Sequence, residues 1–321
     1  MRVVLNLFVI TLLSTSFCFA QPVGFDIPTI NLNLNKGFDI TYSYVLRDVP
    51  HMFCYDSHTG KAAFWNMAKG ERPIVSLSLD KNWEHFSVIQ GNNNRMLYIL
   101  ANSYEGKLKI TNDILQIASK DTSILSNGFS NNQWSLTEIV TFGATPYLFR
   151  YSRTTGEGWL NEIDPELGQI AKETVKYRLE SGWSSISFTQ TAGGIYVLKR
   201  SRFKETIAVE LISTDKYPNN IPNSKLFETN KQLRYEDAQA WTDAVFFAND
   251  KQRYLFLYNS VNGHINLLQL CESLSGYTKS YATTWSTGWS NFNVIEIEGK
   301  PYLFHHKEAN GLARISRIIL E

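Results

Sequence analysis

The stretch GWSNFNVIEIEGKPYLFHHKEANG, residues 288–311, decides the fold. It opens on Trp289, has an apolar residue five positions later at Val294, continues into the aromatic run YLFHH, and ends in Asn-Gly. Apolar positions with a period of two are typical of half-buried β-strands, and Asn-Gly is a preferred hairpin turn. The stretch therefore predicts two antiparallel strands and a turn into a third.

The same pattern occurs six times along the chain. The aromatic runs begin at His51, Leu97, Tyr147, Ile195, Tyr254 and Tyr302. An aromatic anchor precedes each run, at Phe38, Trp83, Trp134, Trp183, Trp241 and Trp289, in steps of 45, 51, 49, 58 and 48 residues. A repeat of this length, made of short strands, is typical of a β-propeller blade, because four strands and their turns need about 50 residues.

The sequence thus predicts an all-β protein, a six-bladed β-propeller of four-stranded antiparallel blades, with residues 21–321 forming one domain. The last repeat supplies only three strands, whereas Ile27 to Leu34 (IPTINLNL) alternates and has no anchor of its own. We expect this N-terminal segment to close the last blade as its outer strand, which would cover an exposed edge. Seven blades are the alternative. Thr214 to Gln239, rich in Asn, Pro and Lys, is expected to be a long loop between blades four and five.

Residues 1–20 are typical of a signal peptide. Arg2 precedes an apolar run from Val3 to Leu13, and Cys18-Phe19-Ala20 provides a cleavage site, so that the mature chain would begin at Gln21. We therefore expect a secreted or periplasmic protein. The apolar run is too short to span a bilayer, which argues against membrane insertion.

The charge balance and the cysteines narrow the range of partners. Removing residues 1–20 takes away one basic and no acidic residue and leaves 30 of each, so the formal net charge becomes zero. Nucleic acid or an anionic membrane would require a basic face, and neither is expected as a partner. Cys54 and Cys271 fall in blades one and five, which are not neighbours, so we expect no disulfide between them.

Signatures of catalysis and of cofactor binding are missing from the sequence. It contains no HExxH, GxSxG, P-loop, paired CxxC or Rossmann-type GxGxxG motif. Its six histidines are scattered rather than grouped at metal-ligand spacing. Glu84, His85 and Asp243 break the repeat near the predicted channel, but a solvated or paired side chain explains each of them better than catalysis. We expect no catalytic residues, no metal and no cofactor.

The candidate ligand-binding residues come from the anchors. In an antiparallel blade, the loop into the first strand and the turn between the second and third strands lie on the same face, so the anchors and the Gly turns share that face. The candidates are Trp83, Trp134, Trp183, Trp241 and Trp289, with the hydroxyl residues Ser135, Ser184, Thr242 and Ser290 that follow four of them. An indole stacks on the C–H face of a sugar while a nearby hydroxyl bonds its oxygens.

A second interpretation of the anchors is structural. Large aromatic side chains commonly fill protein interiors, and a Trp at the start of each inner strand can fill the wedge between blades. The two interpretations are compatible, since an indole packed between blades can leave one edge open. Tyr55, Tyr151 and Tyr258, each 17 residues after its anchor, are expected in the core.

The repeated combination of Gly-Trp-Ser, an aromatic strand and a Gly turn resembles the repeats of bacterial propeller lectins that bind fucose-type sugars, and more loosely those of tectonin-type propellers. The resemblance covers nearly all of residues 21–321. It implies sugar sites between adjacent blades, lined by Trp134, Trp183, Trp241 and Trp289. Those lectins typically have seven blades, and the copies here have diverged, with Phe38 in place of Trp and Glu205-Thr206 in place of the turn Gly.

We therefore expect an exported lectin without catalysis, whose partner is a carbohydrate or glycoconjugate. Simultaneous binding at several pockets would raise its overall affinity through multivalency. The first alternative is a non-enzymatic scaffold that binds a protein through the same face. The second is a propeller-type glycan hydrolase, which would need two carboxyl groups about 5 to 9.5 Å apart.

Overall fold

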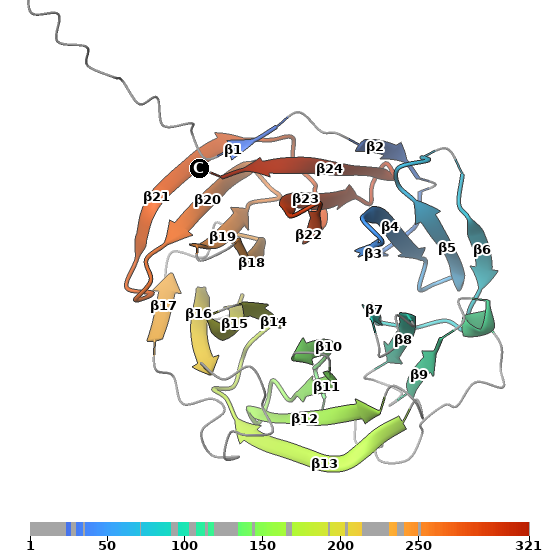
Figure 1. Ribbon diagram of the computed structural model, residues 1–321, viewed down its shortest axis with the longest axis horizontal. Coiled ribbons are helices and arrows are strands. Elements are labelled where there is room, and N and C mark those ends of the chain that lie inside the picture. Colours follow the sequence, from blue (N-terminus) through green and yellow to red (C-terminus); the bar gives the residue numbers. More distant parts are fainter. Residues whose placement is uncertain are drawn as a thin grey trace, which may run out of the picture.

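The computed structural model describes residues 24–26, 30–34, 36–70, 72–90, 96–102, 107–112, 115–118, 134–142, 145–164, 169–191, 193–202, 205–213, 231–235, 241–249 and 252–320. Within these ranges the regular structure is β, apart from the 3₁₀ turn Gln116–Ala118. The strands form six antiparallel sheets that surround a common centre (Figure 1). The prediction of an all-β fold built from repeated antiparallel units is confirmed.

Each sheet is an antiparallel meander whose strands follow one another in chain order from the centre outward. The first sheet has β3 (Ile40–Leu46), β4 (Val49–Tyr55), β5 (Lys61–Asn66) and β6 (Val75–Ser78), and the second has β7 (His85–Gln90), β8 (Met96–Asn102) and β9 (Lys107–Thr111). The third has β10 (Leu136–Phe142), β11 (Thr145–Tyr151), β12 (Glu157–Asp164) and β13 (Gln169–Arg178), and the fourth has β14 (Ser185–Thr191), β15 (Gly194–Ser201), β16 (Thr206–Ser213) and β17 (Lys231–Tyr235). The fifth has β18 (Asp243–Asn249), β19 (Gln252–Tyr258), β20 (His264–Leu270) and β21 (Tyr277–Thr284), and the sixth has β22 (Ser290–Ile297), β23 (Lys300–Lys307) and β24 (Leu312–Ile319).

The N-terminal segment joins the last sheet. Strands β1 (Gly24–Phe25) and β2 (Ile30–Asn33) both pair with β24 in antiparallel register, and Leu32 lies opposite Ala313. Both of these side chains are buried. The expected pairing of this segment with the last repeat is found, although residues 27–29 lie outside the described ranges.

The hydrophobic core lies between the sheets. The innermost strands contact one another in sequence, β3 with β7, then β10, β14, β18 and β22, and β22 contacts β3. A cluster of buried apolar residues fills each of these junctions; the one between the sixth and first sheets includes Phe38, Met52, Phe304 and Ile315. Because the second strand of each sheet is covered on both faces, its sequence is a continuous apolar run, as in YLFLY of β19.

A tyrosine in every second sheet fastens that sheet to the next. The Tyr151 hydroxyl donates to the carbonyl of Glu180 (2.6 Å) and accepts the N–H of the anchor Trp183 (3.3 Å). Tyr55 and Tyr258 make the same two bonds ahead of Trp83 and Trp289. In the second, fourth and sixth sheets, the position five residues before the turn residue holds Ala101, Arg200 and His306 instead. The six units are thus arranged as three pairs, and the expected core position of the three tyrosines is confirmed.

One prediction about the chain was wrong. The segment Thr214 to Gln239, expected to be a loop, contains strand β17, which pairs with β16 as the fourth strand of its sheet. An outermost strand has a neighbour on one side only, so it needs no apolar run, and its sequence KQLRY carries a weak strand signal. The rest of that segment and residues 1–20 lie outside the described ranges. Cys54 and Cys271 are unpaired, as expected.

Candidate functional site

The tryptophan anchors differ in accessibility. Trp83, Trp134, Trp183 and Trp289 are buried, and Trp183 has no exposed surface. Trp241 is half-buried and packs against the cluster between the fourth and fifth sheets. Most anchors therefore fill the wedges between sheets, and Trp241 keeps more open surface than the other four.

Three anchors contact an arginine, lysine or histidine side chain from the second strand of their own sheet. Arg150 lies over Trp134 (5.0 Å to the ring centroid) and Lys199 over Trp183 (4.8 Å), while the His305 ring meets Trp289 edge to face at 4.2 Å between centroids. Each basic residue follows its anchor by 16 positions, a signal that could have been found in the sequence but was missed. These cation–π and ring contacts hold the indoles in the interior.

The hydroxyl residues after the anchors bond to their own sheets. The hydroxyl oxygens of Ser135, Ser184 and Thr242 accept the backbone N–H groups of Arg153 (3.1 Å), Arg202 (3.1 Å) and Ser260 (2.9 Å). The Ser290 hydroxyl donates to the carbonyl of His306 (3.2 Å). These bonds attach the start of each first strand to the end of the second, so the hydroxyls have a structural role whether or not they also meet a ligand.

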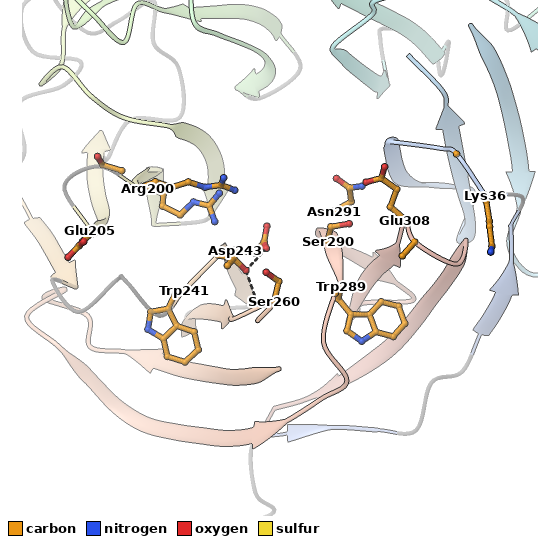
Figure 2. A pocket seen from close by; sticks show the side chains of 16 residues that line it. Lys36, Arg200, Glu205, Trp241, Asp243, Ser260, Trp289, Ser290, Asn291 and Glu308 are labelled. Atoms are coloured by element: carbon orange, nitrogen blue, oxygen red, sulfur yellow. Dashed lines mark hydrogen bonds between the residues drawn. The ribbon is translucent and has the colours of Figure 1, made fainter. Parts of the chain in front are cut away.

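The expected common face of anchors and turns is also found. The turn after the second strand bonds to the segment that leads to the next anchor: Gly182 N–H to the carbonyl of Arg153 (2.9 Å), and Gly288 N–H to that of Ser260 (3.1 Å). On this face a pocket of about 1240 Å³, here called the rim pocket, extends over the fourth, fifth and sixth sheets to residues 36 and 37 (Figure 2).

The rim pocket brings together part of the predicted site. Trp241, Thr242, Trp289 and Ser290 line it, whereas Trp83, Trp134, Trp183, Ser135 and Ser184 do not. Its charged lining consists of Lys36, Arg200, Arg202, Glu205, Asp243 and Glu308. A half-buried indole beside charged and amide side chains can stack on an apolar ring face and bond to polar substituents around it.

A second cavity, of about 600 Å³, lies at the centre and is called the central cavity. The innermost strands of all six sheets line it. Its titratable groups are His85, Glu138, Arg200 and Asp243, and its other polar groups are hydroxyls and the side-chain amides of Asn291 and Asn293. Of the three residues that break the repeat, Asp243 lines both cavities, His85 lines the central one, and Glu84 is exposed and lines neither.

An irregularity in β22 aims two amides toward the first sheet. The strand has a register shift between Ser290 and Asn293, and Asn291 has a φ of 52°, a conformation that Asn tolerates better than most residues. The Asn293 amide donates to the carbonyl of Ser43 (2.9 Å), and the Asn291 amide to that of Asp39 (3.4 Å). The bulge thus joins the last sheet to the first and places Asn291 between the two cavities.

Burial dominates the electrostatics of both cavities. It raises the pKa of Asp243, although the nearby Arg200 acts in the opposite direction, and it lowers the pKa of Arg200 and of His85. Burial also raises the pKa of Glu138 to about 8. Burial likewise raises the pKa of Tyr42, and the charge of Glu138 acts in the same direction. Glu138 is therefore protonated at neutral pH, whereas an exposed glutamate would be ionised.

Glu138 should make the stability of the protein depend on pH. Its pKa is higher in the folded chain (about 8) than in the unfolded chain (4.5), so the folded state holds the proton more tightly. The unfolded state then binds fewer protons at this group between these values, and the contribution of Glu138 to stability should fall as pH rises from about 5 to 8. The variant Glu138→Gln, which stays neutral, should lose less stability over this range in urea unfolding. Parallel curves for the two proteins would contradict this prediction.

The part of the chain that the structure describes contains no group of three or more His, Cys, Asp or Glu residues placed to hold a metal ion. None of its helices has the length and hydropathy that a membrane span requires.

Comparisons with known proteins bear on the fold alone. No family model and no curated protein matches the sequence. Among solved structures, a member of the DUF4221 family from Bacteroides vulgatus has a TM-score of 0.52 at 6% identity, covering 94% of this chain and 99% of its own. A DUF4623 family protein from Bacteroides eggerthii also has a TM-score of 0.52, at 9% identity, covering 90% and 77%. The WD40 domain of Toxoplasma gondii coronin has a TM-score of 0.49 at 13% identity, covering 88% and 69%.

Proposed function

We propose that the protein is a six-bladed β-propeller, exported from the cell, that binds carbohydrate in the rim pocket and performs no catalysis. The blade number is supported by the ring of contacts among the six innermost strands and by the buried cluster at each junction. The N-terminal strand on β24 supports closure of the last blade by the two ends of the chain.

The observation that carries the proposal is the position of Trp241. Its indole lies half-buried in a pocket whose walls hold Arg200, Asp243 and Asn291, which can donate to and accept from sugar hydroxyls. Sugar sites combine an aromatic face with a few convergent polar groups, and this combination occurs here.

The structure favours a smaller number of sites than the repeats alone suggest. Trp83, Trp134 and Trp183 are buried and do not line the rim pocket, so repeated pockets between all blades find no support in them. We therefore propose a principal site over the fourth to sixth sheets, in place of an equal site at every junction.

The test is a glycan array probed with residues 21–321 and with the variant Trp241→Ala. Loss of the stacking surface is expected to weaken binding by about two- to tenfold, because aromatic stacking contributes about 0.5–1.5 kcal/mol. Trp159→Ala is the matched control, since Trp159 is also half-buried but lies on β12 outside the rim pocket. It should leave binding unchanged.

Three outcomes would contradict the proposal. Absence of binding across the array would favour the protein scaffold. Equal loss of binding in both variants would place the site elsewhere or indicate a general loss of structure, which a thermal melt detects. Release of shorter saccharides would indicate hydrolysis and direct attention to the two carboxyl groups of the central cavity, Glu138 and Asp243.

A further inference from the structure

Three residues stand where the rim pocket and the central cavity meet. Arg200, Asp243 and Asn291 line both of them, and they come from the fourth, fifth and sixth sheets. In Figure 2 the side chains of Arg200 and Asp243 extend into the space between these sheets. A ligand that stacks on Trp241 and reaches inward therefore meets this group.

Two of the three nitrogen atoms in the Arg200 guanidinium group lack hydrogen-bond acceptors. Its Nε and Nη1 atoms are buried, and neither has a hydrogen-bond partner among the described residues, Asp243 included. Arg150, which also has unpartnered buried nitrogens, donates from Nη2 to Asn161 (2.7 Å) and lies over two indole rings. Burying a charged donor without an acceptor is costly, and here burial lowers the pKa of Arg200.

Two charged groups act on Arg200, the carboxyl group of Asp243 and the guanidinium of Arg202. The carboxyl group of Asp243 accepts a hydrogen bond from the Thr242 hydroxyl (2.9 Å), and burial raises its pKa. The charged lining of the rim pocket as a whole is balanced, with three basic and three acidic side chains. An anion bound at Arg200 would therefore supply missing hydrogen-bond acceptors rather than cancel a net positive charge.

We propose that Arg200 binds a carboxylate, and hence that the ligand is an acidic saccharide of the uronic or sialic acid type. This inference rests on the proposed function, because Trp241 would stack on the sugar that carries the carboxylate. A guanidinium matches a carboxylate with two parallel N–H···O bonds, which are stronger than bonds to a neutral hydroxyl. The carboxyl group of Asp243 repels anions, and it repels a doubly charged phosphate more strongly than a carboxylate. It can also accept a hydrogen bond from a neighbouring hydroxyl of the sugar.

The experiment measures binding to glycans in matched chemical forms. Residues 21–321 are tested on carboxylated glycans, on the same glycans after reduction of the carboxyl group to an alcohol, and on sulfated and neutral glycans. The carboxylated forms should bind at least about tenfold more tightly than the reduced forms, as expected for a charge-assisted pair. Arg200→Gln should abolish this preference, whereas Arg178→Gln, an exposed change on β13, should retain it.

The outcomes separate this inference from the proposed function. Equal binding of carboxylated and reduced glycans, or binding of neutral or sulfated glycans alone, would contradict the acidic-sugar inference and leave a lectin. No binding at all would contradict both. If Arg200→Gln lowers the melting temperature, Arg200→Lys is the alternative variant. It keeps the positive charge but lacks the planar guanidinium that donates two parallel hydrogen bonds, so it should lose most of the preference for carboxylated glycans. Full preference in Arg200→Lys would contradict the bidentate contact.

Discussion

Replacing Gly263 with Ala is expected to lower the free energy of unfolding by about 2–5 kcal/mol. About 1–2 kcal/mol comes from placing a non-glycine residue in a left-handed conformation and about 1–3 kcal/mol from overpacking. Gly263 has a φ of 76°, and a Cβ atom there would overlap the carbonyl oxygen of Trp285. That oxygen belongs to the backbone next to the outer strand, and the N–H of Trp285 donates to the carbonyl of Gly263 (2.8 Å). The clash can be relieved only by moving the outer strand. Urea or thermal unfolding measures the loss.

Gly299→Ala is the matched control for this change. Gly299 has a similar φ of 70°, but a Cβ atom there would meet nothing within 4 Å. Gly299→Ala should therefore lower the free energy of unfolding only by the backbone strain, about 1–2 kcal/mol. Equal losses in the two variants would show that the backbone conformation, rather than the contact with Trp285, requires glycine at position 263. The repeated turns at Gly60 and Gly156 have the same contact with the outer strand and should behave like Gly263.

Removal of the carboxylate in Glu210→Gln is expected to cost about 3–5 kcal/mol, the usual range when one partner of a buried ion pair is lost. The Lys199 ammonium lies 2.6 Å from the Glu210 carboxylate, and both side chains are about 4% exposed. The same ammonium lies over the Trp183 ring. Without Glu210, a buried positive charge would lose its counter-ion inside the fourth sheet. Thermal or urea unfolding of the variant and the parent measures the effect.

The double variant Lys199→Met/Glu210→Leu tests the cause. Because it removes both charges and keeps apolar volume, it should recover most of the stability, and the cycle of single and double variants should show strong coupling. Glu157→Gln, an exposed change on β12, should have an effect within about 0.5 kcal/mol. A loss below about 1 kcal/mol in Glu210→Gln would mean that the pair behaves as a solvent-exposed one.

The repeat pattern predicted the strands well because each repeat buries its second strand on both faces. The run YLFHH, expected in the second strand of the last repeat, lies within β23, Lys300–Lys307. The outer strands are harder to predict, since they are half-exposed and need no apolar run. Strand β17, Lys231–Tyr235, was taken for a loop for this reason.

The candidate site was only partly predictable. The sequence marked every anchor as equivalent, and Trp241 was named together with four tryptophans that are buried. The residue 16 positions later is Arg150, Lys199 or His305 after three of the buried anchors and Leu257 after Trp241. It does not by itself separate the two groups, because the buried Trp83 is followed by Ile99 at this position. Arg200 was not identified as a site residue. It lies in the fourth sheet, at the position that holds a tyrosine in the first, third and fifth sheets. Only the pairwise arrangement of the sheets shows why this position differs in the fourth sheet.

The sequence alone predicted an all-β fold of repeated antiparallel units and the core position of Tyr55, Tyr151 and Tyr258. Periodicity and turn chemistry are local, so they can be read along the chain. The accessibility of the Trp241 indole and the lack of acceptors at two nitrogen atoms of the Arg200 guanidinium depend on the tertiary structure. Arg200, Asp243 and Asn291 lie far apart in sequence and come together because the inner strands of the fourth, fifth and sixth sheets pack side by side. Burial and the balance of charge at that place depend on packing, which no single repeat encodes.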